Sequence, residues 1–257
     1  MNLTISTKKF ECSARTPDEA KRQLVLATRI FANEGHFDAF GHVSIRNPEN
    51  PNTFFQSHSL SPEFVTMDDI LEIDLDGNVV QGIEGKKPYG ERVLHCRVLA
   101  ARSDVDAVFH GHPPALIPFT CCRDLTLQPV HVYGSLQYKG IGFYDDADVT
   151  SASLVVTIAE GDRLARALGD KYTCLMRGHG ITTAAENLPI LVYNTVLLVW
   201  NAQVQLDILK AGGTPKCFSE EEGRAYATIA YGDNVLNRAW DYYVARAKKA
   251  MPDIADL

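Results

Sequence analysis

The chain contains 257 residues, 46% hydrophobic and 22% charged, and its 25 Lys and Arg against 32 Asp and Glu give a net charge of −7. This composition is typical of a globular protein and excludes a disordered, collagen-like or coiled-coil chain. The acidic balance argues against nucleic acid or an anionic membrane as a partner. A chain of this length buries about 70% of its unfolded surface without a structural metal, so a bound metal would serve chemistry.

The cysteines and the apolar segments indicate the compartment. The first twenty residues lack the apolar core of a secretory signal, and the most apolar stretch, residues 190–200, is too short to cross a membrane. No C-x-x-C pair is present. We therefore expect a cytoplasmic protein with mostly buried free thiols at Cys12, Cys96, Cys121, Cys122, Cys174 and Cys217.

The first part of the chain predicts one helix followed by hairpins. Residues 16–19, Thr-Pro-Asp-Glu, combine a capping box with proline at the first helical position. The apolar face that follows ends at Gly35, which predicts the end of this helix. From 41 to 80, short apolar runs and the Asp76-Gly77 turn predict strands joined as hairpins.

The remaining elements mix helices and strands. Periodicity predicts helices over about 89–102, 151–168, 187–210 and 219–249, and strands over 105–110, 172–176 and 181–184. The acidic run Asp145, Asp146 and Asp148 is interpreted as a solvated turn and helix start. The pattern favours an α/β fold with a mixed, largely antiparallel sheet covered by helices. No linker or repeat interrupts the chain, so we expect one domain over 1–257, with C-terminal helices at about 187–249.

Three histidines and one glutamate form the most informative pattern. His110 and His112 are one residue apart, so on a strand both imidazoles face the same side and can meet one metal ion. His179 lies between two glycines at another strand end, which suits an exposed third ligand. Three histidines with an open position are typical of a catalytic metal site. Glu91, at the start of a predicted helix, could complete the coordination sphere or act as a general acid or base.

Each of these signals also has a simpler structural explanation. Paired histidines on a strand are often a surface feature, and Gly-His-Gly can be a tight turn. We interpret His36 as a capping or surface residue, His95 as a helical neighbour of Glu91, and His131 as a core histidine in a strand. No G-x-G-x-x-G, P-loop or G-x-S-x-G motif supports a different chemistry. Spacing alone leaves the metal hypothesis and the structural explanation both open.

A family resemblance adds to this pattern. The order of motifs from about residue 18 to 210 resembles the class II aldolase/adducin superfamily: GHVSIR (41–46), DLDG (74–77), GERVLH (90–95), VFHGHP (108–113) and LMRGHG (175–180). The resemblance implies that His110, His112 and His179 bind one divalent metal ion and that Glu91 is the acid/base residue. It also implies a three-layer α/β/α fold, in a tetramer with active sites at subunit interfaces.

The departures from this family concern the substrate. Sugar-phosphate aldolases of the family have Asn and Ser where this chain has His42 and Tyr89, and a Thr- and Gly-rich loop where it has Gln-Ser-His-Ser (56–59). Those small groups let backbone amides grip a phosphate, which a tyrosine would obstruct. With these departures the chain resembles instead the branch of metal-dependent decarboxylases that act on hydroxylated aromatic or pyridine dicarboxylates.

The sequence thus predicts a metal-dependent C–C lyase that decarboxylates a hydroxylated aromatic or heteroaromatic carboxylate. One Mn, Zn, Co or Fe ion would chelate the substrate hydroxyl and its neighbouring carboxylate. We expect His42, His58, Ser59 and Gly90 to contact this small molecule. The alternatives are a class II aldolase on a hydroxy-carbonyl or sugar-phosphate substrate, a non-haem iron oxygenase, and an adducin-like scaffold without catalysis.

Overall fold

An eight-stranded sheet organises the protein, whose computed structural model describes residues 13–145 and 154–257. Its strand order is β4-β3-β2-β1-β5-β8-β7-β6. Every neighbouring pair is antiparallel except β6 and β7, which confirms the mixed, largely antiparallel sheet. The strands are β1 (His42–Asn47), β2 (Asn50–Ser57), β3 (Ile70–Asp74), β4 (Val79–Gln81), β5 (Ala107–Gly111), β6 (Gly142–Tyr144), β7 (Thr173–Met176) and β8 (Gly180–Ala185).

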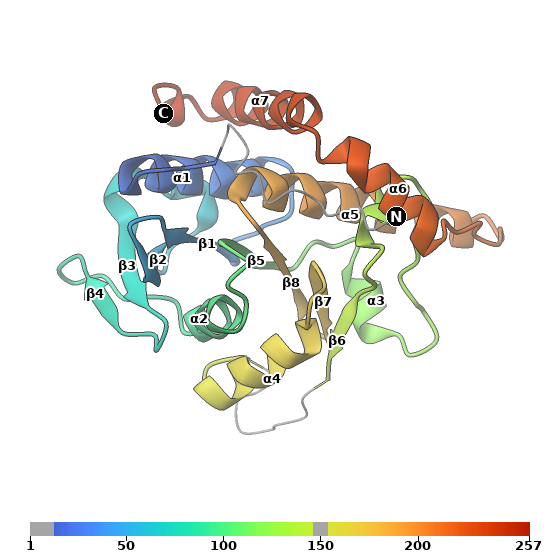
Figure 1. The fold of residues 1–257 in the computed structure, drawn as a ribbon, viewed down its shortest axis with the longest axis horizontal. Helices are drawn as coiled ribbons and strands as arrows, with labels where there is room; N and C mark the ends of the chain where they lie inside the picture. Colours follow the sequence, from blue (N-terminus) through green and yellow to red (C-terminus); the bar gives the residue numbers. More distant parts are fainter. Residues whose placement is uncertain (1–12, 146–153) are drawn as a thin grey trace.

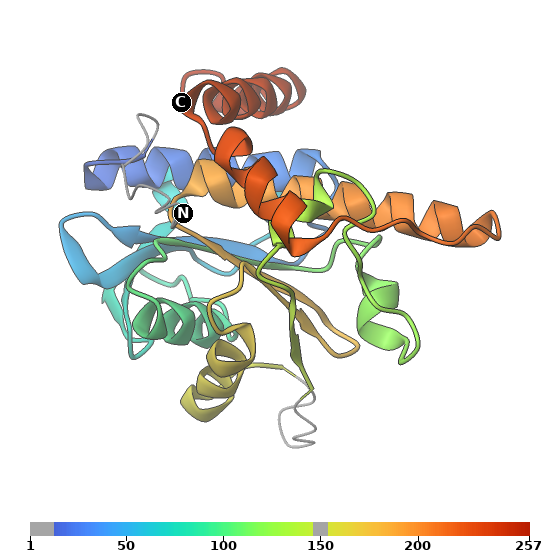
Figure 2. The same ribbon diagram turned by 45° about the vertical axis from the view of Figure 1, so that its right-hand side comes forward.

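Helices cover both faces of this sheet, which confirms the three-layer α/β/α architecture (Figures 1 and 2). One face carries α1 (Pro17–Asn33) and α5 (Leu188–Lys210), with α6 (Glu220–Ala230) and α7 (Asp233–Ala250) beyond them. The opposite face carries α2 (Arg92–Ala101) and α4 (Ile158–Leu168). The short α3 (Ile117–Cys121) contacts β7 near the end of the sheet.

The alternation of strand side chains explains why there are two hydrophobic cores. Phe55 and Phe109 pack in the core on the α1 and α5 side, whereas their neighbours Phe54 and Val108 pack in the core beneath α2 and α4. Successive side chains of a strand point to opposite faces, so a strand covered on both faces is apolar throughout. One sheet therefore serves both cores, although the prediction of a single domain over 1–257 stays a prediction.

Capping residues decide where several helices begin. The predicted capping box at Thr16 and Glu19 is present and starts α1. A second box at Thr157 and Glu160 starts α4, so the predicted start near residue 151 is wrong: 154–156 are not helical, and 151–153 lie outside the described residues. The helix predicted from residue 89 begins only at Arg92, because residues 90 and 91 form a turn.

Other predictions need correction. The single helix predicted over 219–249 is two helices, because extended backbone at Gly232 ends α6 and caps α7. Sequence analysis did not predict α3 or β6, which are too short to show a period. The expectation of mostly buried thiols is wrong for the described cysteines: Cys96 and Cys174 are buried, whereas Cys121, Cys122 and Cys217 are exposed. Cys12, Asp146 and Asp148 lie outside the described residues, and Asp145 is exposed and paired with Arg177.

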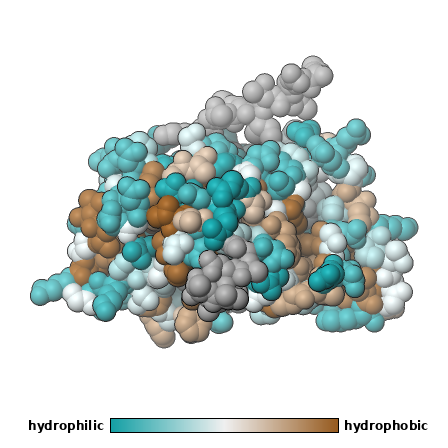
Figure 3. All heavy atoms as spheres, turned by 90° about the horizontal axis from the view of Figure 1, so that it is seen from below, coloured by the Kyte–Doolittle hydropathy of each residue, from teal (hydrophilic) through white to brown (hydrophobic). Residues whose placement is uncertain are grey.

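The surface on the side of α2 and α4 mixes hydrophilic and hydrophobic side chains (Figure 3). Val156 and Ile158, at the start of α4, are among its exposed apolar residues. No helix in the described part of the chain is long and apolar enough to cross a membrane.

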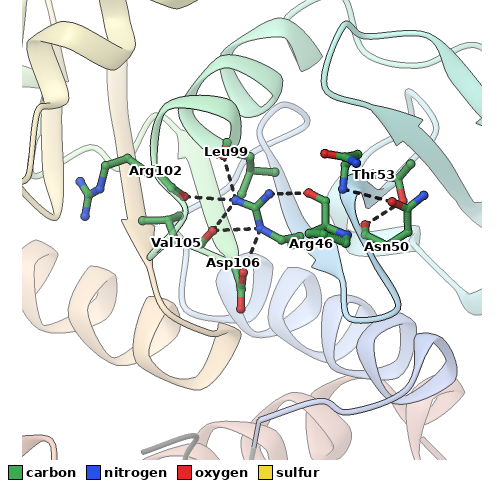
Figure 4. Close-up of polar contacts among 9 residues, drawn as sticks. Arg46, Asn50, Thr53, Leu99, Arg102, Val105 and Asp106 are labelled. Carbon is green, nitrogen blue, oxygen red and sulfur yellow. Dashed lines mark hydrogen bonds and ion pairs between the residues drawn. The ribbon is translucent and has the colours of Figure 1, made fainter. Parts of the chain in front are cut away.

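Arg46 fixes the C-terminal end of α2 to the sheet (Figure 4). Its guanidinium donates to the carbonyl oxygens of Leu99, Arg102 and Val105, at distances of 2.8, 3.1 and 2.8 Å from Nη2. It also pairs with Asp106 at 2.9 Å and donates to the Pro51 carbonyl at 2.7 Å. The last carbonyls of a helix have no partner within the helix, so this one side chain satisfies groups that would otherwise lack hydrogen bonds.

We expect Arg46→Ala to lower the free energy of unfolding by about 3 kcal/mol, because several half-buried carbonyl groups lose their donor. Denaturant unfolding measures this loss. The matched control is Arg22→Ala, since Arg22 is exposed in the middle of α1 and its loss should change the free energy of unfolding by less than about 0.5 kcal/mol. Equal effects of the two substitutions would contradict the assigned role of Arg46.

Candidate metal centre

The end of β5 presents the first two histidines. His110 lies on the strand and faces the α2 side with Val108, and His112 follows directly after the strand ends at Gly111. The two imidazole rings have their centroids 5.2 Å apart. The predicted i, i+2 arrangement therefore brings the rings together.

His179 approaches the same place from the turn between β7 and β8. Its ring centroid lies 4.9 Å from that of His110 and 5.1 Å from that of His112. Gly180 allows this approach, because a Cβ there would lie 2.4 Å from the Gly111 carbonyl oxygen and 2.6 Å from Cδ2 of His112. Gly178 adopts φ +62°, which favours glycine. Both glycines around His179 are thus explained by the backbone of the turn.

Glu91 faces these rings from the N-terminus of α2. Its Oε2 lies 3.6 Å from Nε2 of His110 and 3.7 Å from Nε2 of His179, and its Oε1 accepts a hydrogen bond from the Val155 amide at 3.0 Å. The three histidines offer nitrogen atoms that all lie within 4.8 Å of one another. Two strand ends and one helix start therefore meet at a single point.

The hydrogen bonds around the rings leave nitrogen lone pairs available. Nδ1 of His110 lies 3.1 Å from the Ile181 carbonyl oxygen, which can only accept, so Nδ1 carries the hydrogen and Nε2 the lone pair. That Nε2 and Nε2 of His112 are both buried with no hydrogen-bond partner among the described residues. A second hydrogen bond that fixes the ring is typical of a metal-bound histidine. This donor set fits a divalent metal ion.

Burial also keeps these groups uncharged. Desolvation lowers the pKa of His110 well below its ordinary value, and repulsion from His42 and the other imidazoles lowers it further. The pKa of His112 is lowered in the same way, by burial and then by His179. Burial raises the pKa of Glu91, against the opposing effect of His179. Neutral imidazoles are the form that binds a metal, and a carboxyl with a raised pKa is suited to proton transfer.

His42 lies behind this cluster. It pairs with His110 across β1 and β5, and the two rings lie 5.2 Å apart. His42, Glu91 and His110 form a second group whose ligand atoms lie within 4.8 Å of one another. Tyr89 covers His42 with its ring centroid 4.5 Å away and donates its hydroxyl hydrogen to the Leu60 carbonyl at 2.6 Å.

The other predicted substrate residues have different surroundings. His58 is buried, and both ring nitrogens have partners: Nε2 lies 3.0 Å from Asp69 Oδ1 and Nδ1 lies 3.3 Å from the Ser59 carbonyl oxygen. Ser59 and Gly90 are exposed. Their contact with substrate stays a prediction.

Three histidines differ from their sequence interpretation. His36 is buried, so the surface alternative is wrong, but its amide donates to the Phe31 carbonyl at the end of α1, as the capping alternative expected. His131 lies in a turn rather than a strand and contacts Tyr133 and Trp200, each with ring centroids 4.5 Å away. His95 is more than a helical neighbour of Glu91, because it is fully buried and hydrogen-bonded to His42 and Ser44. The i, i+2 spacing of His42 and Ser44 on a strand was the available signal for this group.

Comparison with known proteins agrees with this fold. The chain belongs to the family described by the Class II Aldolase and Adducin N-terminal domain, which matches residues 22–206. It is similar to the 3,4-dihydroxyphthalate decarboxylase of Arthrobacter keyseri, at 28% identity over 90% of this chain and 95% of that protein. It is also similar to Decarboxylase tropJ of Talaromyces stipitatus, at 28% identity over 72% of this chain and 74% of that protein.

A solved structure supports the fold. The L-fuculose 1-phosphate aldolase of Glaciozyma antarctica superimposes with a TM-score of 0.76 and 23% identity, covering 91% of this chain and 90% of that chain. The class II aldolase architecture is thereby confirmed for this chain.

Replacing Gly180 tests how the metal centre is built. Gly180→Ala places a Cβ against the Gly111 carbonyl and His112, so we expect the affinity for zinc to fall by at least about tenfold. Gly178→Ala is the matched control: nothing lies within 4 Å of its Cβ, and its positive φ costs only about 1 kcal/mol of stability. Chelator competition measures both affinities. The assignment fails if Gly180→Ala binds zinc as tightly as Gly178→Ala.

The buried histidines also predict how stability depends on pH. Burial lowers the pKa of His36 to about 4 and of His42 to about 3, and lowers those of His95 and His110 well below 6.5. The unfolded chain then binds more protons once the pH falls below about 6.5. The free energy of unfolding of the metal-free protein should be highest above that pH and fall towards pH 4, by up to about 1.4 kcal/mol per pH unit for each histidine.

Two carboxyl groups act in the opposite direction. The pKa values of Glu91 and Glu186 are raised by burial, so these groups favour the folded state as the pH falls. The effect of the four histidines exceeds that of the two carboxyl groups, so we expect a net loss of stability as the pH falls. Denaturant unfolding at pH 7.5, 6 and 5 with a chelator present measures it, and stability that stays level or rises towards pH 5 would contradict the expectation.

Proposed function

We propose that this protein is a metal-dependent C–C lyase that decarboxylates a hydroxylated aromatic or heteroaromatic carboxylate. The observation that carries the proposal is the convergence of His110, His112 and His179, whose ligand atoms lie within 4.8 Å of one another, with Glu91 beside them. The decarboxylase names of two similar proteins support this reaction over an aldol cleavage. The substrate class rests on the name of the relative that covers 90% of this chain.

In this proposal His110, His112 and His179 hold one divalent ion: Mn, Zn, Co or Fe. When bound, such an ion acts as a Lewis acid that polarises a substrate hydroxyl oxygen and draws electron density from the ring. Neutral histidines accept all four metals, so the donor set does not select among them.

Glu91 is the proton donor in the proposed reaction. The bond between the ring carbon and the departing carboxylate breaks, CO2 leaves, and the electron pair remains on the ring carbon. That carbon takes a proton from the Glu91 carboxyl group, whose pKa is raised by burial. The Val155 amide, bonded to Oε1, keeps the carboxyl oriented with Oε2 towards the histidines.

The remaining residues orient the substrate. His42 lies nearest to the cluster, and Tyr89 restricts the space beside it. Since His58 is engaged with Asp69 and the Ser59 carbonyl, its contribution is to hold the loop that presents Ser59. Gly90 is exposed next to Glu91, where the proposal places the substrate ring. A homotetramer, a cytoplasmic location and a small-molecule substrate complete the proposal.

Two substitutions separate metal binding from proton transfer. His110→Ala should remove both the bound metal and turnover. Glu91→Gln should retain the metal and lower kcat by about 10²–10⁴-fold, because the proton donor is lost. The matched control is Glu221→Gln on the exposed start of α6, which should behave as the unmodified protein.

Assays of CO2 release from ortho-hydroxy aromatic dicarboxylates, with elemental analysis of each variant, measure these effects. Full turnover in protein shown to be metal-free would contradict the proposal. Release of an aldehyde without CO2 would instead indicate an aldolase, and oxygen consumption during turnover would indicate an oxygenase.

A further inference from the structure

A chain of three buried polar side chains leads from the core to the metal centre. Ser44 Oγ lies 2.7 Å from Nδ1 of His95, and Nε2 of His95 lies 2.6 Å from Nδ1 of His42. Ser44 and His95 have no solvent-exposed surface, and His42 has 4%. The strand period explains the arrangement, since His42 and Ser44 both point from β1 towards α2, which carries His95.

The hydroxyl group of Ser44 determines where the hydrogens lie on these three hydrogen-bonded side chains. Its hydroxyl is fully buried, and His95 is its one hydrogen-bond partner in the described part of the protein. A buried hydrogen without an acceptor is costlier than an unfilled lone pair, so the Ser44 hydroxyl donates to Nδ1 of His95.

The direction of hydrogen-bond donation at Ser44 then determines the direction at the two histidines. An imidazole that accepts at Nδ1 carries its own hydrogen on Nε2, so His95 donates to Nδ1 of His42. His42 in turn accepts at Nδ1 and carries its hydrogen on Nε2, the nitrogen left for the site. Burial lowers the pKa values of both histidines, which agrees with one hydrogen on each ring.

We propose that Ser44 and His95 are positioning residues that fix His42 as a hydrogen-bond donor towards the site and so exclude it as a metal ligand. The inference rests on the proposed metal centre. A nitrogen that carries a hydrogen has no lone pair for a metal, so of the two groups of ligand atoms, only His110, His112 and His179 can hold the ion. His42 Nε2–H is then directed at carboxylate oxygens, either those of Glu91 or those of a bound substrate.

If hydrogen-bond donation ran in the opposite direction, from His42 through His95 to Ser44, the metal site would differ. If Ser44 accepted from His95, the buried hydroxyl hydrogen would have no acceptor among the described residues, and His42 would present a lone pair. His42, Glu91 and His110 would then be a competing set of ligands. The two directions therefore predict different metal sites from the same atomic positions.

NMR of the protein with ¹⁵N-labelled histidine distinguishes them, because two-bond couplings report which ring nitrogen carries the hydrogen. In both metal-free and zinc-loaded protein, His42 and His95 should be in the Nε2–H form, with signals assigned through His42→Ala and His95→Gln. An Nδ1–H form of either ring would overturn the inference. The measurement requires no turnover, so its failure is separate from failure of the proposed decarboxylation.

Metal content gives a second readout. His42→Ala should retain one zinc per chain, as the unmodified protein does, whereas His110→Ala should lose it. Loss of zinc from His42→Ala would show that His42 is a ligand and would overturn the inference. Elemental analysis after dialysis measures both variants.

Substitutions of His95 and Ser44 test whether these residues position His42. His95→Leu should lower kcat by about 10–100-fold while zinc content is unchanged, because His42 loses the donor that fixes its ring. His95→Gln, whose amide can donate from the same place, should restore most of this loss. Ser44→Ala should leave His95 as a mixture of both tautomers in the NMR spectrum.

The matched control is Thr183→Ala, since Thr183 is a buried hydroxyl on β8 that bonds to Thr195 rather than to this chain of residues. It should leave the tautomers of His42 and His95 unchanged. Equal activity of His95→Leu and the unmodified protein would overturn the positioning role.

Discussion

The close antiparallel contact between the ends of β5 and β8 is the constraint on which the site depends. Gly180 allows the two backbones to approach, because a Cβ there would meet the Gly111 carbonyl oxygen, and this approach brings His179 to the two histidines at the end of β5. The sheet supplies rigidity, because β5 and β8 are both central strands with helices on either face. Rigid elements hold ligand geometry better than loops do, and here two strand ends position three imidazoles.

The sequence predicted those parts of the fold that depend on local signals. The capping box at Thr16 and the hairpins between 41 and 80 are encoded in neighbouring residues, and so is the pairing of His110 with His112. The convergence of His179 with that pair depends on strand pairing between segments about 70 residues apart, which only the family resemblance could suggest. The contact of His95 with His42 and Ser44 joins segments about 50 residues apart, and nothing in the local sequence encodes it or the direction of its hydrogen bonds. The break at Gly232 was missed because apolar periodicity continues on both sides of it.

Burying so many imidazoles opposes folding at low pH and prepares the site for its ligand. His42, His95 and His110 are all buried and held neutral on the same side of the sheet, between β1, β5 and α2. Desolvation of these rings removes the protons that would compete with a metal, so the same physical effect lowers acid stability and favours ligation. Hydrophobic residues around them, such as Phe54 and Leu94, maintain that desolvation.

The Arg46 contacts have a mechanical consequence for the far end of α2. This helix has ten residues and so is about 15 Å long, with the guanidinium group at one end and Glu91 at the other. A rotation of about 4° around the anchored end would displace the Glu91 carboxylate by about 1 Å, a shift that can alter rates by about a hundredfold. The position of the Glu91 carboxylate, the proposed proton donor, therefore depends on an arginine at the opposite end of the helix, about 15 Å away.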